Sequence, residues 1–215
     1  EKDHVQAPVF MADKTIEWLR DHQAKTAGNA DKDGGAQKPF FIYLGPPVPH
    51  DPRVAPPKYQ AMYDPARLGL PKSFLAKHPF DNGELRVRDE LLAPIPRTQA
   101  EMRKQLADYY AITSHLDFHV GRILDELKQR DLLDTTLIVY TSDHGLAVGG
   151  MHGLMGKQNL YEHNKAPLIL AGPGIPQGRR EALVYLFDLF PTLCEYAGLP
   201  IPEQVDGRSL LPAIK

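Results

Sequence analysis

The chain has 215 residues, 42% of them hydrophobic and 24% charged, which predicts a packed core and argues against wholesale disorder. Its 25 basic and 27 acidic residues give a formal net charge of -2, so the sequence lacks the basic surplus that binding to nucleic acid or anionic membranes requires. The one cysteine excludes an intrachain disulfide, and no apolar run approaches the roughly 18 residues of a membrane span.

The first part of the chain predicts one helix, one loop and one strand. Apolar residues that step by three and four positions from Val9 to Leu19 predict an amphipathic helix. The small, polar and glycine-rich residues 26–38 predict a mobile surface loop. The continuous apolar run at residues 40–44, which ends at Gly45, predicts a buried strand.

A proline-rich stretch follows at residues 46–97. It holds eleven of the 20 prolines and shows no sustained helical or strand period. Long loops without regular structure are uncommon and are either functional or disordered. Because this stretch keeps apolar residues such as Tyr59 and Phe74, we expect an ordered rim and not a flexible linker.

The remaining elements alternate between helix and strand. Residues 99–130 predict a long helix, residues 137–141 and 168–171 two buried strands, and the segment from Asp188 to Gly198 a last helix. Strands that are apolar on both faces and separated by helices indicate an α/β fold, with a mostly parallel sheet covered by helices on both faces. Three strands are few for such a sheet, so we expect part of a larger α/β domain.

Ionisable residues directly follow two of these strands, where ligands bind in open α/β sheets. Asp143 and His144 can offer a carboxylate oxygen and an imidazole nitrogen to one metal ion. The alternative is that Asp143 caps the next turn and His144 is partly buried. His50 lies between prolines, which restrict its imidazole and suit general-acid work or oxyanion binding, and an ordinary loop histidine is the alternative.

A glycine-rich stretch at residues 149–156 brackets His152 and precedes Lys157. Glycines allow the backbone to approach an anion closely, and Lys157 would supply positive charge where negative charge develops in a transition state. The alternative is a surface loop with a solvated lysine.

Three further residues are expected to have structural roles and not catalytic ones. His115 and His119 lie one helical turn apart, as in some zinc sites, but no third ligand is evident, so surface or packing roles are expected. Cys194 is expected to be a small core residue of the last helix.

Taken in order, the segments resemble the sulfatase family within the alkaline-phosphatase-like superfamily. The matching pieces are PFFIYLGPPVPHDP (39–52), YYAITSHLDFHVGRILDEL (109–127), TLIVYTSDHG (136–145), HGLMGKQNLYEH (152–163), APLILAGPGI (166–175) and LFDLFPTLCEYAGLPIPEQVDGRSLLP (186–212). The resemblance implies that residues 1–215 are the second half of a sulfatase catalytic domain, truncated at the N-terminus and lacking the C-terminal subdomain.

The resemblance also implies a chemistry. The family hydrolyses sulfate esters with a formylglycine, made from the cysteine of a Cys-x-Pro-Ser-Arg motif, and with a calcium ion that neutralises the sulfate oxygens. Carried over to this chain, it makes Asp143 and His144 metal ligands, and His50 and Lys157 catalytic residues that also bind the sulfate. His152 becomes a candidate for the substrate rim.

The chain departs from the family pattern because it contains no Cys-x-Pro-Ser-Arg motif and therefore no formylglycine. It also lacks the early pair of aspartates that completes the metal site, so it carries a partial calcium site. The expectation is a sulfatase parent protein and a chain that is inactive alone. The alternatives are a phosphodiesterase or phosphonate hydrolase of the same superfamily, or a non-catalytic binding module.

The expected partners follow from the same resemblance. They are a small sulfate ester or a sulfated glycan, and the N-terminal half of the domain itself. Neither nucleic acid nor a membrane span is expected. Related sulfatases imply a periplasmic, secreted or lysosomal parent protein.

Overall fold

The computed structural model describes residues 2–28, 38–81, 83–157 and 165–214. The chain divides into two compact units. The larger unit comprises Glu1–Leu133 and His144–Lys165, and the smaller unit comprises Asp134–Asp143 and Ala166–Lys215.

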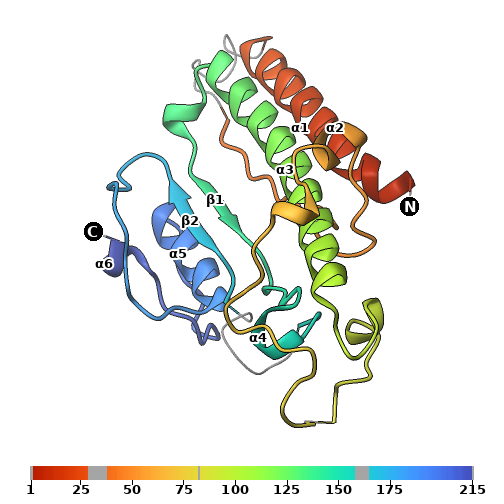
Figure 1. Ribbon diagram of the computed structural model, residues 1–215. Helices are drawn as coiled ribbons and strands as arrows, with labels where there is room; N and C mark the ends of the chain where they lie inside the picture. The colour runs from red at the N-terminus through yellow and green to blue at the C-terminus, as the bar shows by residue number, and fades with distance from the viewer. Residues whose placement is uncertain (1, 29–37, 82, 158–164, 215) are drawn as a thin grey trace. The chain divides into compact units, whose positions relative to one another are not determined.

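Two long helices, α1 (Lys2–Gly28) and α3 (Gln99–Gln129), lie side by side in the larger unit (Figure 1). They confirm the two helices predicted from apolar spacing. Because α1 extends to Gly28, part of the predicted loop at residues 26–38 is helical, and residues 29–37 lie outside the described residues. Neither these helices nor any other in the described part of the chain has the length and apolar composition to cross a membrane.

A buried carboxylate joins the two helices. Glu126 of α3 is 5% exposed and accepts hydrogen bonds from Arg20 of α1, at 2.8 Å, and from Arg130, at 2.5 Å. The hydrogen bond from Arg20 is the largest influence and, together with Arg130, lowers the pKa of Glu126 to about 2 against the opposing effect of burial.

His115 and His119 are buried in α3, 2% and 7% exposed, so of their two expected roles packing is correct and the surface is not. Nδ1 of His119 lies 3.0 Å from Arg122, which can only donate, so His119 carries its proton on Nε2. That proton is donated to Nε2 of His115, at 3.2 Å. His115 therefore carries its own proton on Nδ1, which is buried and has no hydrogen-bond partner among the described residues.

The rim, residues 46–97, is ordered and irregular, as predicted, with residue 82 outside the described residues. Three short helical turns interrupt it: α2 (Pro57–Gln60), η1 (Pro65–Arg67) and η2 (Glu90–Leu92). Tyr59 of α2 packs with Val48 and Ala55 of the rim against three buried residues of α3, which are Ala111, Ile112 and Leu116. The rim is thereby attached to the helical scaffold.

The predicted strand at residues 40–44 is wrong. The segment is irregular, and the side chains of Phe41 and Tyr43 are 76% and 82% exposed. A strand needs a neighbour that exchanges backbone hydrogen bonds with it, and none of the described residues forms a ladder with this segment.

The smaller unit contains the two other predicted strands, β1 (Ile138–Thr141), which follows η3 (Leu133–Thr135), and β2 (Leu168–Ala171). They run antiparallel, with Ile138 opposite Ala171, so the parallel arrangement expected for them is wrong. A crossover between parallel strands is usually a helix, and the described part of this connection, residues 142–157 and 165–167, holds only the four-residue turn α4 (Gly150–Gly153). Both strands are half-buried and not fully buried as expected.

Three helical elements complete the smaller unit: η5 (Leu186–Asp188), α5 (Leu189–Tyr196) and α6 (Leu211–Ile214). Asp188 precedes α5 as predicted, but its carboxylate accepts from the backbone N–H groups of Tyr185, at 2.8 Å, and Arg208, at 2.9 Å, instead of capping the helix. Cys194 is half-buried, so its predicted place in the core is not what the structure shows.

The buried histidines predict an acid-sensitive scaffold. Burial, the neighbouring His119 and Lys58 of α2 lower the pKa of His115 from 6.5 to about 4, and burial and Arg122 lower that of His119 against the attraction of Asp13 of α1. The unfolded chain therefore binds protons that the native chain does not, and stability present above pH 6.5 is lost as the pH falls toward 4.

Between pH 7 and pH 5 we expect the free energy of unfolding to fall by roughly 2 kcal/mol, measured by urea denaturation. His115→Asn, which cannot titrate, should remove much of that fall. A variant with the pH dependence of the unchanged protein would contradict the assignment.

Candidate functional site

His50 lies in a turn of the rim, within the larger unit. Its backbone N–H donates to the carbonyl oxygen of Pro47, and its Nδ1 lies 2.9 Å from the carbonyl oxygen of Asp51. Because a carbonyl oxygen only accepts, Nδ1 carries the proton, and Nε2 is the nitrogen that can exchange a proton with a ligand. The side chain is 40% exposed, which leaves it accessible from solvent.

Arg88 holds the carboxylate beside His50. The guanidinium of Arg88 forms an ion pair with Asp51, and its NH1 also lies 2.9 Å from Asp89. The side chain of Asp51 is 13% exposed, and this burial acts to raise its pKa. The hydrogen bond from Arg88 and the charges of His50 and Arg88 outweigh burial and hold the pKa of Asp51 below its ordinary value, so Asp51 is a carboxylate.

The glycine-rich loop, residues 147–157, folds back on itself. Backbone N–H groups at one end donate to carbonyl oxygens at the other, in the pairs Ala147–Gly156, Val148–Met155 and Gly149–Leu154. Val148, Met151 and His152 have positive φ values of 43°, 44° and 63°. Such angles are uncommon outside glycine and persist where the surroundings determine them, often at functional sites.

The two predicted site residues of this loop differ in exposure. His152 is half-buried: its backbone N–H donates to the carbonyl oxygen of Ser73, at 2.9 Å, and its ring lies 5.8 Å from that of His78 between centroids. Lys157, directly after Gly156, is exposed. The structure thus brings His50, His152 and Lys157 into one unit.

A three-residue segment of the rim contacts both the His50 turn and the glycine-rich loop. Arg88 binds Asp51, and Glu90 accepts hydrogen bonds from the backbone N–H groups of Met155 and Gly156, each at 2.9 Å. The segments that carry His50 and Lys157, far apart in the sequence, are therefore held by one short stretch.

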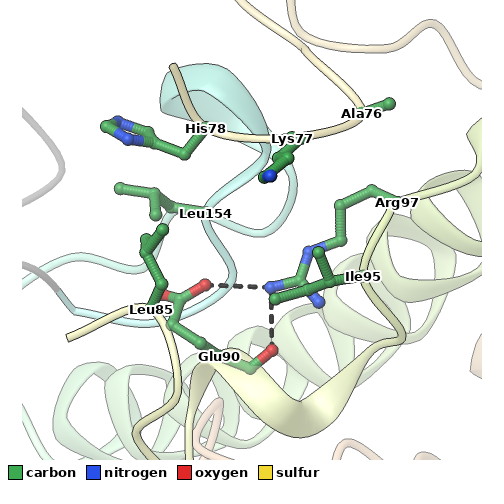
Figure 2. A pocket seen from close by; sticks show the side chains of 8 residues that line it. All are labelled: Ala76, Lys77, His78, Leu85, Glu90, Ile95, Arg97 and Leu154. Atoms are coloured by element: carbon green, nitrogen blue, oxygen red, sulfur yellow. Dashed lines mark hydrogen bonds and ion pairs between the residues drawn. The ribbon is translucent and has the colours of Figure 1, made fainter. Parts of the chain in front are cut away.

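Sequence reasoning missed Arg88, Glu90 and Arg97. The rim has no helical or strand periodicity, so its sequence does not show which of its charged side chains are buried. The one indirect indication of such supporting residues was the expectation that the rim is ordered. Glu90 and Arg97 line a small cavity of about 40 Å³ (Figure 2), together with Ala76, Lys77, His78, Leu85, Ile95 and Leu154.

The two predicted metal ligands belong to different units. Asp143, in the smaller unit, is exposed after β1. His144, in the larger unit, donates its Nδ1 proton to the carbonyl oxygen of Gly145, at 2.9 Å, which directs the Nε2 lone pair outward from that bond, as is common in metal-binding histidines.

The described residues contain no group of three or more candidate ligands. Calcium takes about six to eight oxygen ligands, so Asp143 and His144 alone are too few to hold a calcium ion.

A family model described as sulfatase matches residues 10–199. Arylsulfatase K of Canis lupus familiaris is 30% identical over 93% of this chain, and the extracellular sulfatase SULF-1 homolog of Drosophila melanogaster is 31% identical over 96%. The solved structure of the phosphonate monoester hydrolase SpPMH from Silicibacter pomeroyi matches 90% of this chain with a TM-score of 0.70 and 34% identity. The chain spans 38%, 18% and 41% of the lengths of these three proteins, respectively.

Close packing around the glycine-rich loop gives a direct test. Gly153 has φ +87°, and a Cβ there would lie 2.2 Å from the carbonyl oxygen of Leu75. We expect Gly153→Ala to lower the free energy of unfolding by about 2 kcal/mol or more, measured by denaturation. The control is Gly121→Ala in α3, where a Cβ meets open space and should stabilise by roughly 0.5–1 kcal/mol. Equal effects of the two changes would show that the loop yields freely.

Proposed function

This chain belongs to the sulfatase family and has part of an alkaline-phosphatase-like α/β fold, and from this we propose that the protein containing it hydrolyses sulfate esters. The 215 residues contain no Cys-x-Pro-Ser-Arg motif, so a formylglycine nucleophile would come from outside them. The chain would then be the second half of a catalytic domain, and by itself inactive.

One observation of the site carries the proposal. Two segments with the residue types that sulfate-ester hydrolysis needs, a solvent-accessible histidine and an exposed lysine, are held by the same rim residues 88–90. A role for both in one reaction requires such a common support, because catalytic groups must keep a fixed mutual geometry.

His50 would act on the leaving oxygen. Its Nδ1–H donates a hydrogen bond to the carbonyl oxygen of Asp51, so Nε2 is the nitrogen that exchanges a proton with the substrate. As the nucleophile from outside these residues bonds to sulfur and the bond from sulfur to the ester oxygen breaks, Nε2 of the protonated ring gives its proton to that oxygen. The leaving group departs as an alcohol or phenol, and His50 is left neutral. Before the proton is transferred, the carboxylate of Asp51, 3.3 Å from Nδ1, lies next to the positively charged imidazolium of His50.

Lys157 would bind the sulfate and balance the negative charge that develops on its oxygens. His152, half-buried in the same loop, would contribute to the substrate rim. For the cofactor we propose calcium, with Asp143 and His144 as two of its ligands and the others from outside the described residues. The ion would supply Lewis-acid stabilisation of the sulfate oxygens.

A second function has an observation in its favour. The structure of a phosphonate monoester hydrolase is 34% identical over most of this chain. Sulfate and phosphonate esters both present a tetrahedral anionic centre, so the same histidine and lysine would serve either reaction. Assays with both kinds of ester separate the two functions.

For the substrate we propose a small sulfate ester or a sulfated glycan, since the relatives include an arylsulfatase and an extracellular sulfatase. The name of the fly relative supports an extracellular location, and we propose a periplasmic, secreted or lysosomal one for this protein.

The proposed roles predict the effects of removing each side chain. In the protein that contains this chain, we expect His50→Ala and Lys157→Ala to lower kcat/KM for an aryl sulfate by roughly 100-fold or more, measured by release of the phenol. Lys104→Ala is the control, because Lys104 pairs with Asp108 on the surface of α3.

An aryl phosphonate monoester assayed alongside tests the second function. Turnover of the phosphonate alone would replace the proposed activity with the alternative one. Full activity in both site variants would remove His50 and Lys157 from the mechanism.

A further inference from the structure

Glu90 and Arg97 form a buried ion pair in the rim. They are 1% and 5% exposed, and Oε2 of Glu90 lies 3.0 Å from the Arg97 guanidinium. Figure 2 shows the two side chains facing each other. Charges buried this deeply are tolerated when the remaining hydrogen-bonding atoms also find partners.

Those partners are backbone atoms, and three of them belong to the glycine-rich loop. Glu90 accepts from the N–H groups of Met155 and Gly156, and Nε of Arg97 donates to the carbonyl oxygen of Gly153, at 3.0 Å. The other Arg97 nitrogens bind rim carbonyl oxygens, those of Glu90, Ala93 and Pro94. One ion pair therefore fixes residues 153–156 to the rim.

The loop needs external support. Its internal hydrogen bonds join residues 147–149 to residues 154–156 and set its shape, but they do not attach it to anything else. Two residues inside it, Met151 and His152, hold left-handed backbone angles that relax unless their surroundings prevent it. Ser73 holds the tip of the loop through the N–H groups of these two residues, and the ion pair holds its base.

We propose that Glu90 and Arg97 are positioning residues that set where Lys157 stands relative to His50. The inference rests on the proposed function of those two residues. Glu90 accepts a hydrogen bond from the N–H of Gly156, the residue directly before Lys157. Arg88 in the same segment forms an ion pair with Asp51 beside His50. Both members of the pair are too deeply buried to touch a substrate themselves.

The competing explanation is that the pair stabilises the fold and nothing more. A buried ion pair can often be replaced by apolar side chains of similar volume without loss of stability. Glu90→Leu combined with Arg97→Met makes that replacement, and it leaves the N–H groups of Met155 and Gly156 without their acceptor. The double variant therefore keeps apolar side chains of similar volume in the rim but loses the hydrogen bonds that attach the rim to the glycine-rich loop.

The test uses the protein that contains this chain, with an aryl sulfate as the probe. We expect Glu90→Gln to lower kcat by roughly tenfold or more while KM changes less than about threefold, because Lys157 acts on charge that develops in the transition state. In the double variant, kcat should stay low under conditions in which denaturation shows the variant to be fully folded. Recovery of kcat in the folded double variant would overturn the proposal.

Glu126→Gln is the matched control. Glu126 is likewise a buried carboxylate bound by arginines, but its partners are Arg20 of α1 and Arg130 after α3, so it joins the two helices. It should lower stability and leave kcat unchanged. An equal loss of kcat in Glu126→Gln and Glu90→Gln would show that destabilisation alone accounts for the effect.

Hydrogen exchange at the Met155 and Gly156 amides provides a readout independent of activity. We expect exchange at both to speed up by roughly tenfold or more in Glu90→Gln and to stay unchanged in Glu126→Gln. If the unchanged protein hydrolyses no sulfate or phosphonate ester, the proposed function fails, and hydrogen exchange still reports whether Glu90 holds the loop. Unchanged exchange in Glu90→Gln would refute the positioning role of Glu90 even in an active enzyme.

Discussion

The hydrogen-bonded pair of Glu90 and Arg97 fixes the rim and the glycine-rich loop of the larger unit to each other. The rim has few regular elements, so its backbone polar groups cannot be satisfied by ladders or long helices and need other partners. A guanidinium with several donors and a carboxylate with two acceptor oxygens supply them in a small volume. The same two side chains then serve the rim and the glycine-rich loop, which ties the path of one to the path of the other.

The parts of the fold that the sequence predicted well are those in which local pattern and environment agree. The stripe in α1, the long periodicity of α3 and the apolar runs of β1 and β2 each identify an element by spacing alone. Residues 40–44 have the same apolar signal but no strand forms, because a strand is completed by a neighbour and not by its own residues. The direction of β2 relative to β1 was not encoded in either strand, since it depends on the connection between them.

The candidate site divides in a similar way. The sequence singled out His50 because it lies between prolines after a predicted strand. It singled out His152 and Lys157 because they lie within or directly after a glycine-rich stretch. Their supports could not be found by the same means. Glu90 and Arg97 are seven positions apart in an aperiodic segment, and the sequence does not distinguish a charged residue that is buried from one that is solvated. Whether Asp143 and His144 bind calcium stays a prediction, because two donors define no coordination geometry.

The two supports of the site differ in their contact with water. Arg88, whose side chain is 64% exposed, holds the His50 turn through a pairing that solvent ions reach, whereas Glu90 and Arg97 are shielded from them. Screening acts over about 8–10 Å at ordinary ionic strength and weakens exposed charge pairs far more than buried ones. Added salt would therefore weaken the Arg88–Asp51 pair that holds the His50 turn, while the Glu90–Arg97 pair that holds the loop before Lys157 stays intact. Ionic strength is thus a means of varying the position of His50 without moving Lys157.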